Sequence, residues 1–163
     1  MIQFDVLEDR LAEKVASFRT AQPFEHLIVD GVLDDAKARA LVAAIPPPKA
    51  DQQSRDYVFA RNKFEHPRFY EYGPLFAEMR DDLISDRFRR FLCELLGYEV
   101  FVDDAFVGGG IHQGGTGSYL DMHADFNRHP KNTQWVRELN ILFYLNEGWQ
   151  DAYGGHLDLR YAK

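Results

Sequence analysis

The spacing of the apolar residues changes at Gly97, and this change constrains the fold more than any other feature. Before Gly97, apolar residues recur every three or four positions, as in amphipathic helices. After it come short runs that favour strands, separated by turn residues: EVFVDDAFV, GSYLDMHAD, ELNILFYLN and GGHLDLRYA. Such runs are typical of an antiparallel barrel or jelly roll. We therefore predict an α+β fold, with helices over residues 1–97 and the first strands of a jelly roll over residues 98–163.

The first 97 residues predict helices around one strand. Apolar residues at steps of three and four predict a helix over the first twenty residues, and PFEHLIVDGVL reads as a strand. Asp34 is expected to open a helix that the prolines from Pro46 stop. The polar residues 46–56 predict an exposed loop inside a single domain over residues 1–163. From Gly73 to Leu96 we predict two helices, parted near Ser85 and capped by Gly97.

Charge and composition exclude several classes of protein. The 26 acidic residues outnumber the 19 basic ones, for a net charge of -7, so a broad nucleic-acid-binding face is not expected. No segment approaches the roughly 18 apolar residues of a membrane span, and the start MIQFDVLEDR lacks the pattern of a secretion signal. The lone Cys93 excludes an intramolecular disulfide. We expect a cytoplasmic protein without nucleic-acid or membrane partners.

His123 and Asp125 carry the strongest chemical signal. They are two positions apart in a run that we interpret as a strand, so both side chains leave the same face. An imidazole and a carboxylate on one face supply two members of the two-histidine, one-carboxylate set that binds non-haem iron(II) and leaves positions open. The spacing alone is a weak signal, because a pair of surface polar residues also produces it.

The order of the surrounding segments resembles the iron(II) and 2-oxoglutarate dependent oxygenases of the prolyl hydroxylase type. GSYLDMHADFNRHP is followed by RELNILFYLNEGW and YGGHLDLRY. In that family a strand with His-x-Asp precedes a Tyr-Leu-Asn strand end, a Trp and a Gly-Gly-x-Leu strand. The stretch PFEHLIVDGVLDDAKARALVAAIP is also similar to the family's entry strand and helix, so the resemblance touches residues 23–163.

The resemblance implies a double-stranded β-helix core, Fe(II) and 2-oxoglutarate, and hydroxylation of an unactivated carbon of a small-molecule or peptide substrate, with proline or a prolyl residue as the leading candidate. It also implies His123 and Asp125 as metal ligands and catalytic residues, and Tyr144 at the distal carboxylate of 2-oxoglutarate. Ascorbate is a further cofactor that the family allows. Asn140 shares a predicted strand face with Tyr144, and is a second cofactor-binding candidate.

Other polar residues near these motifs are weaker candidates. Gln113 and Asn127 are candidates for orienting ligands through hydrogen bonds, and Arg137 for binding a carboxylate substrate. His112 and His129 are candidate ligands, although loop positions account for both. The glycine-rich GGGIHQGGTG lacks the Gly-Lys-Ser/Thr of a phosphate-binding loop.

The sequence departs from the family at its C-terminal end. The family's third ligand, a later histidine, and its 2-oxoglutarate-binding Arg or Lys cannot be placed, and His156 is the only candidate within GGHLDLR for the missing ligand. We expect the jelly roll to be incomplete, with the chain a fragment, or with a missing C-terminal segment or a homo-oligomer completing the sheet. Two other functions stay open: a non-catalytic jelly-roll binding or scaffold protein, and a metal-dependent sugar isomerase of the cupin type.

Overall fold

The computed structural model describes residues 1–49, 53, 56 and 58–161. The chain divides into two compact units. Unit 1 comprises Met1–Pro46, Arg68–Phe106 and Asp158–Lys163, and unit 2 comprises Pro47–Pro67 and Val107–Leu157. None of the helices in the described ranges is long and apolar enough to cross a membrane. The single domain over residues 1–163 stays a prediction.

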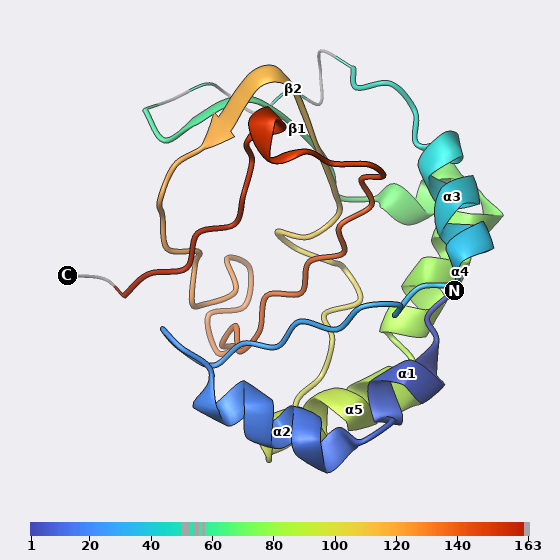
Figure 1. Ribbon diagram of the computed structural model, residues 1–163, viewed down its shortest axis with the longest axis vertical. Helices are drawn as coiled ribbons and strands as arrows, with labels where there is room; N and C mark the ends of the chain where they lie inside the picture. The colour runs from blue at the N-terminus through green and yellow to red at the C-terminus, as the bar shows by residue number, and fades with distance from the viewer. Residues whose placement is uncertain (50–52, 54–55, 57, 162–163) are drawn as a thin grey trace. The chain divides into compact units, whose positions relative to one another are not determined.

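Unit 1 is helical. Its helices are α1 (Phe4–Glu8), α2 (Leu11–Thr20), α3 (Asp35–Ala44), α4 (Pro74–Leu83) and α5 (Asp86–Leu96), with a 3-10 turn, η2, at Phe69–Tyr72. Helix α5 packs against α1, α2 and α4, and α3 packs against α4 (Figure 1). The apolar face of α5 is the centre of this core, with four buried side chains: Phe88, Phe91, Leu92 and Leu95. Burial of this face follows from its helical spacing of apolar residues.

The predicted helix ends of unit 1 are confirmed. Asp34 precedes α3 and accepts a hydrogen bond from the backbone N–H of Lys37 at 2.9 Å, and α3 ends before the prolines. Ser85 separates α4 from α5 and accepts from the N–H of Phe88 at 3.2 Å. Gly97 follows α5 with φ 84°, in the left-handed region that glycine adopts without strain. These side chains and this glycine satisfy backbone groups that a helix end leaves open.

Two predictions in unit 1 are wrong. The single helix over the first twenty residues is divided into α1 and α2, because Arg10 adopts a left-handed conformation with φ 46°. The strand predicted in PFEHLIVDGVL is not formed by these residues, all of which the structure describes. They make one isolated bridge, between Leu33 and Ile2, and the N–H of Gln3 donates to Val32 O at 2.7 Å. These two contacts involve only residues 2 and 3, which are too short a partner for a longer ladder.

The N-terminal amino group is bound by α4. Its nitrogen lies 2.5 Å from Glu78 Oε1 and 2.9 Å from Asp82 Oδ2, and Lys37 Nζ also lies 2.5 Å from Glu78 Oε1. Burial opposes the charge on Met1, but the hydrogen bonds to Glu78 and Asp82 outweigh it and raise the pKa of the amino group. The hydrogen bond from Lys37, followed by that from Met1, lowers the pKa of Glu78.

Unit 2 contains an antiparallel pair of strands, β1 (Ala60–His66) and β2 (Ile111–Leu120). The pairing runs from Ala60 opposite Leu120 to His66 opposite Ile111, with an irregularity at Asn62, where φ is 52°. Both strands are visible side by side in Figure 1. The sequence did not indicate β1, because its segment ARNKFEH is mostly polar and lacks an alternating pattern.

The α+β class is confirmed, but the described residues do not form a jelly roll or a double-stranded β-helix. Among the four strand-like runs, only GSYLDMHAD contributes to β2, and within the described ranges the others form no strand. A strand persists only when a neighbour satisfies its N–H and C=O groups. Apolar residues of the three runs that form no strand are exposed, among them Phe101, Leu142 and Leu157. In the proline-rich segment, residues 46–49 form no helix or strand, as predicted, and residues 50–52, 54 and 55 of the expected loop lie outside the described residues.

Candidate metal centre

His123 and Asp125 lie just beyond β2, not on the strand predicted for them. Leu120 is the last residue of β2, because its partner β1 begins opposite it at Ala60, and the chain then continues without regular structure. The two side chains nevertheless converge. His123 Nε2 lies 3.4 Å from Asp125 Oδ1, and both side chains remain about two-fifths exposed, at 39% and 42%. The imidazole and the carboxylate therefore share one open site.

A hydrogen bond fixes which nitrogen of His123 faces Asp125. His123 Nδ1 lies 2.7 Å from the backbone carbonyl oxygen of Asp121. A carbonyl oxygen only accepts, so Nδ1 must carry the hydrogen, and in the neutral ring Nε2 is left with its lone pair. This lone pair and Asp125 Oδ1 are two electron-rich atoms directed at the same small space. Such a pair attracts a cation or a proton between them.

The separation of the two atoms suits adjacent metal ligands. With metal–ligand bonds of about 2.1 Å, two ligands at a right angle lie about 3.0 Å apart. The observed 3.4 Å between Nε2 and Oδ1 is close to this value, and both side chains are exposed enough to adjust. His123 and Asp125 thus fit two adjacent positions of an iron(II) coordination shell.

The second oxygen of Asp125 is held by Asn140 and Arg137. Asn140 Nδ2 donates to Asp125 Oδ2 at 3.1 Å, and an Arg137 guanidinium nitrogen lies 3.5 Å from the same oxygen. Arg137 also donates to Asn140 Oδ1 at 3.0 Å, and its guanidinium carbon lies 4.7 Å from the centre of the Phe126 ring. Asn140 and Arg137 therefore hold the Asp125 carboxylate through Oδ2, the oxygen that does not face His123.

A short backbone hairpin brings these residues together. The N–H of Arg137 donates to Asn127 O, and the N–H of His129 donates to Trp135 O, both at 3.0 Å. The chain turns at residues 132–135, where the N–H of Trp135 donates to the carbonyl oxygen of Asn132 at 2.9 Å. Arg137 is thereby returned beside the segment that carries Asp125.

A third metal ligand is not found among residues 1–49, 53, 56 and 58–161. No group of three His, Cys, Asp or Glu side chains in these ranges is arranged to hold a metal ion. His129 instead accepts hydrogen bonds through Nδ1 from the N–H groups of Lys131 and Asn132. The exposed His156 joins no such group either.

His112 lies on β2 opposite Glu65. Desolvation by the surrounding atoms lowers the pKa of its imidazole, although part of the residue is exposed to solvent. The charges of Lys63 and Arg137 act in the same direction, while those of Glu65 and Asp125 oppose them. The side chain therefore favours the neutral form within the electrostatic reach of Asp125.

The remaining candidate residues are placed as follows. The Tyr144 side chain is 65% exposed, and no interaction with another described residue links its hydroxyl to His123 or Asp125. Gln113 pairs with the buried His66, whose Nε2 lies 2.8 Å from Gln113 Oε1. The sequence did not reveal the hydrogen bond between Asn140 and Asp125, because the strand pattern predicted that Asn140 shares a face with Tyr144.

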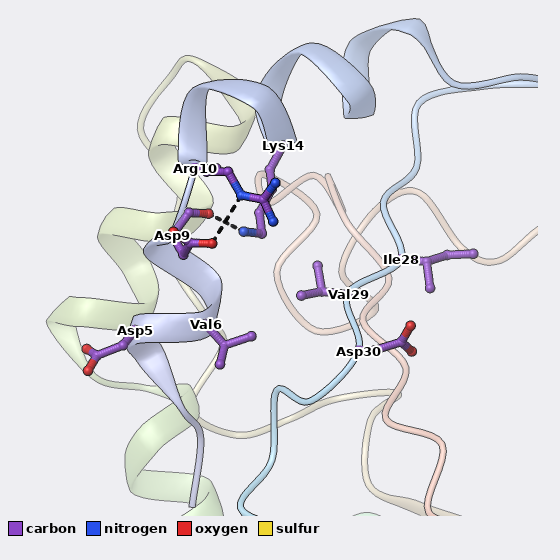
Figure 2. Close-up of a pocket in the computed structure, with 8 residues that line it drawn as sticks. All are labelled: Asp5, Val6, Asp9, Arg10, Lys14, Ile28, Val29 and Asp30. Atoms are coloured by element: carbon purple, nitrogen blue, oxygen red, sulfur yellow. Dashed lines mark hydrogen bonds and ion pairs between the residues drawn. The ribbon is translucent and has the colours of Figure 1, made fainter.

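A separate pocket lies in unit 1, and it has a volume of about 500 Å³. Its walls are α1, the start of α2 and residues 28–30 (Figure 2). Its basic side chains are already engaged: Arg10 Nε lies 3.3 Å from Asp9 Oδ2, and Lys14 Nζ donates to the carbonyl oxygen of Asp9. The pocket contains none of the residues predicted to bind metal.

Comparison with known proteins identifies the C-terminal part of the chain. Residues 109–163 match the profile of the 2OG-Fe(II) oxygenase superfamily. No curated protein and no solved structure matches the chain. The superfamily implies Fe(II) and 2-oxoglutarate, but the match does not distinguish a prolyl hydroxylase from its other branches. The matched segment contains His123, Asp125, Asn140 and Tyr144, and with it the chain carries a 2OG-Fe(II) oxygenase superfamily domain over residues 109–163.

Proposed function

We propose that the protein is an Fe(II)- and 2-oxoglutarate-dependent dioxygenase that hydroxylates an unactivated carbon, with His123 and Asp125 as metal ligands. The observation that carries the proposal is the approach of His123 Nε2 to Asp125 Oδ1 at 3.4 Å, with Nδ1 turned to Asp121 O. A neutral imidazole and a carboxylate directed at one point are the donor types that non-haem iron(II) prefers. The superfamily match over residues 109–163, the segment that contains both residues, supports the proposal.

Iron held by His123 and Asp125 would supply the activation of dioxygen, and the protein supplies orientation. In the overall reaction, dioxygen gives one oxygen atom to the substrate as a hydroxyl and one to succinate, while 2-oxoglutarate loses carbon dioxide. The task of this chain is to present Nε2 and Oδ1 to the metal while leaving neighbouring positions open. Asp121, Arg137 and Asn140 serve that task by fixing the ring of His123 and the carboxylate of Asp125.

The substrate proposed is a small molecule or a peptide, and proline or a prolyl residue is the specific candidate. Support for the prolyl branch comes from the order of motifs around His123, Tyr144 and the Gly-Gly pair at 154–155. Tyr144 is proposed to bind the distal carboxylate of 2-oxoglutarate, and ascorbate to keep the iron reduced. Tyr144 is exposed and therefore accessible to such a ligand.

The test measures iron and product separately. Fe(II) binding is titrated anaerobically, and succinate formation from 2-oxoglutarate is then followed in air with and without iron. Asp125→Ala is expected to abolish tight Fe(II) binding and iron-dependent succinate. Asp151→Ala removes an exposed carboxylate of the same unit, in the 3-10 turn η3 (Asp151–Tyr153), and should leave both unchanged. Equal iron affinity in the wild-type protein and Asp125→Ala would refute the assignment.

A non-catalytic binding or scaffold protein is the second candidate. It is favoured by one observation: in the described part of the chain, no third side chain joins His123 and Asp125 in a metal-binding group. This candidate predicts weak metal binding without succinate formation. Iron-dependent succinate would eliminate it.

A further inference from the structure

We propose that Asn140 is the positioning residue that sets Asp125 for metal binding, with its amide orientation dictated by Arg137. This role rests on the proposed function, because Asn140 has it only if Asp125 binds the metal. Asn140 is thereby assigned to the metal centre and not to 2-oxoglutarate. The assignment depends on which atoms donate and which accept.

Arg137 determines which way the Asn140 amide points. A guanidinium has only donors, and an Arg137 nitrogen lies 3.0 Å from the side-chain oxygen of Asn140. The amide oxygen must therefore face Arg137, and the NH₂ group is left facing Asp125. That NH₂ donates to Asp125 Oδ2 at 3.1 Å. The opposite amide orientation would set two donors against each other and two acceptors against each other.

Arg137 is itself held in place on its other side. Its guanidinium lies over the Phe126 ring at 4.7 Å, a distance at which a cation is attracted to the ring face. The Phe126 ring is packed against Gly108, where a Cβ would lie only 2.7 Å from a ring carbon. Arg137 is the least exposed member of the cluster, with 22% of its side chain accessible. A continuous chain of contacts thus leads to Asp125 from Gly108, through Phe126, Arg137 and Asn140.

This arrangement divides the two oxygens of Asp125 between two tasks. Oδ2 accepts from Asn140 and faces Arg137, whereas Oδ1 faces His123 Nε2. With Oδ2 occupied, the carboxylate presents Oδ1 as a single ligand and does not need to be reoriented when a metal arrives. Groups that hold metal ligands in this way typically contribute about 10–100-fold to metal affinity.

The contacts of the Asn140 amide are with Arg137 and Asp125. Its oxygen accepts from Arg137, and one of its two N–H bonds is directed to Asp125. The second N–H bond is the one donor of the amide that these two contacts do not use. The geometry therefore reassigns Asn140 from the cofactor pocket, where the strand pattern had placed it, to the support of the carboxylate ligand.

The test uses Mn²⁺ as a paramagnetic probe on the full chain, with NMR signals of His123 and Asp125 as the readout. In the wild-type protein both signals should broaden over the same range of Mn²⁺ concentration. Asn140→Leu keeps the size of the side chain but removes its donor, and the Mn²⁺ concentration at half-broadening should rise roughly tenfold or more. Asn140→Gln retains an amide donor and should lose less affinity than the Leu variant.

Gln134→Leu is the matched control, because it converts an exposed amide of the same hairpin into the same apolar side chain. Its half-broadening concentration should equal that of the wild-type protein. Equal Mn²⁺ titrations for Asn140→Leu and the wild type, with both His123 and Asp125 broadened, would overturn the positioning role and leave the proposed function standing. Absence of broadening at His123 and Asp125 in the wild-type protein would instead remove the proposed function, and the role of Asn140 with it.

Discussion

Replacing Gly108 by alanine should destabilise unit 2 by two separable effects. Gly108 has φ +78°, and an L-residue in the left-handed region costs roughly 1–2 kcal/mol. The added Cβ would also lie 2.7 and 2.8 Å from two ring carbons of Phe126, whereas carbon atoms prefer about 3.5–4.0 Å. The ring must therefore move by about 1 Å, which disrupts its contact with Arg137 and costs a further ~0.5–1 kcal/mol.

Gly117→Ala separates the two effects. Gly117 has nearly the same φ, +75°, and a Cβ added there would have no atom of the described residues within 4 Å, so this variant carries the backbone strain alone. Urea unfolding of both variants should show that Gly108→Ala loses about 0.5–1 kcal/mol more free energy of unfolding than Gly117→Ala. Equal losses would refute the packing of Phe126 between Gly108 and Arg137. The NMR chemical shifts of the Phe126 ring, compared between the wild-type protein and Gly108→Ala, provide an independent measure of the displacement of the ring.

Two further predictions concern the helices of unit 1. Ser85→Ala removes the acceptor for the N–H of Phe88 and should lower the free energy of unfolding by about 1 kcal/mol, measured by chemical denaturation; an unchanged value would exclude Ser85 as a cap. Glu78→Gln should lower Tm and flatten its dependence on pH. The raised pKa of the Met1 amino group contributes stability that is complete below about pH 8.0 and is lost as the pH rises through the folded pKa. The lowered pKa of Glu78 contributes stability that is complete above about pH 4.5 and is lost as the pH falls through the folded pKa. Thermal melts from pH 3 to 10 test this, and the same pH profile in Glu78→Gln and the wild type would contradict it. Glu94→Gln, an exposed carboxylate on α5, should leave the profile unchanged.

The helices of unit 1 were predictable because their boundaries are encoded locally. Asp34, Ser85 and Gly97 each satisfy or permit a helix end using neighbouring backbone groups, so no distant partner is needed. The break at Arg10 could not be predicted in the same way. Arginine has no intrinsic preference for the left-handed conformation that it adopts there.

The strands were less predictable because a strand depends on a partner that the sequence does not identify. β2 formed where the polar segment beginning at Ala60 supplied a neighbour, and it ended at Leu120, where that neighbour ended. The runs around Phe101, Leu142 and Leu157 have equally good strand composition, but their described residues form no strand and these three side chains are exposed. Local preference for a pleated conformation is too weak to hold a strand without its hydrogen-bonding partner.

The convergence of His123 and Asp125 was predicted from a strand that these residues do not form. A period of two was expected to place His123 and Asp125 on one strand face, yet they converge in an irregular segment, at 3.4 Å. The hydrogen bond that the His123 ring donates to the carbonyl oxygen of Asp121 replaces the strand as the source of orientation. The link from Asn140 to Asp125 spans 15 positions and depends on the return of the chain, which residue spacing cannot reveal.

The hairpin between Asn127 and Arg137 has a consequence for how this segment tolerates change. The N–H of Arg137 donates to the carbonyl oxygen of Asn127 and closes its base, which lies between Asp125 and Asn140 in the sequence. The tip, near Thr133 and Gln134, is exposed and touches neither group. Residues exchanged or inserted at the tip would leave the metal-facing geometry intact, which makes this turn a natural place to attach a spectroscopic label or a recognition peptide.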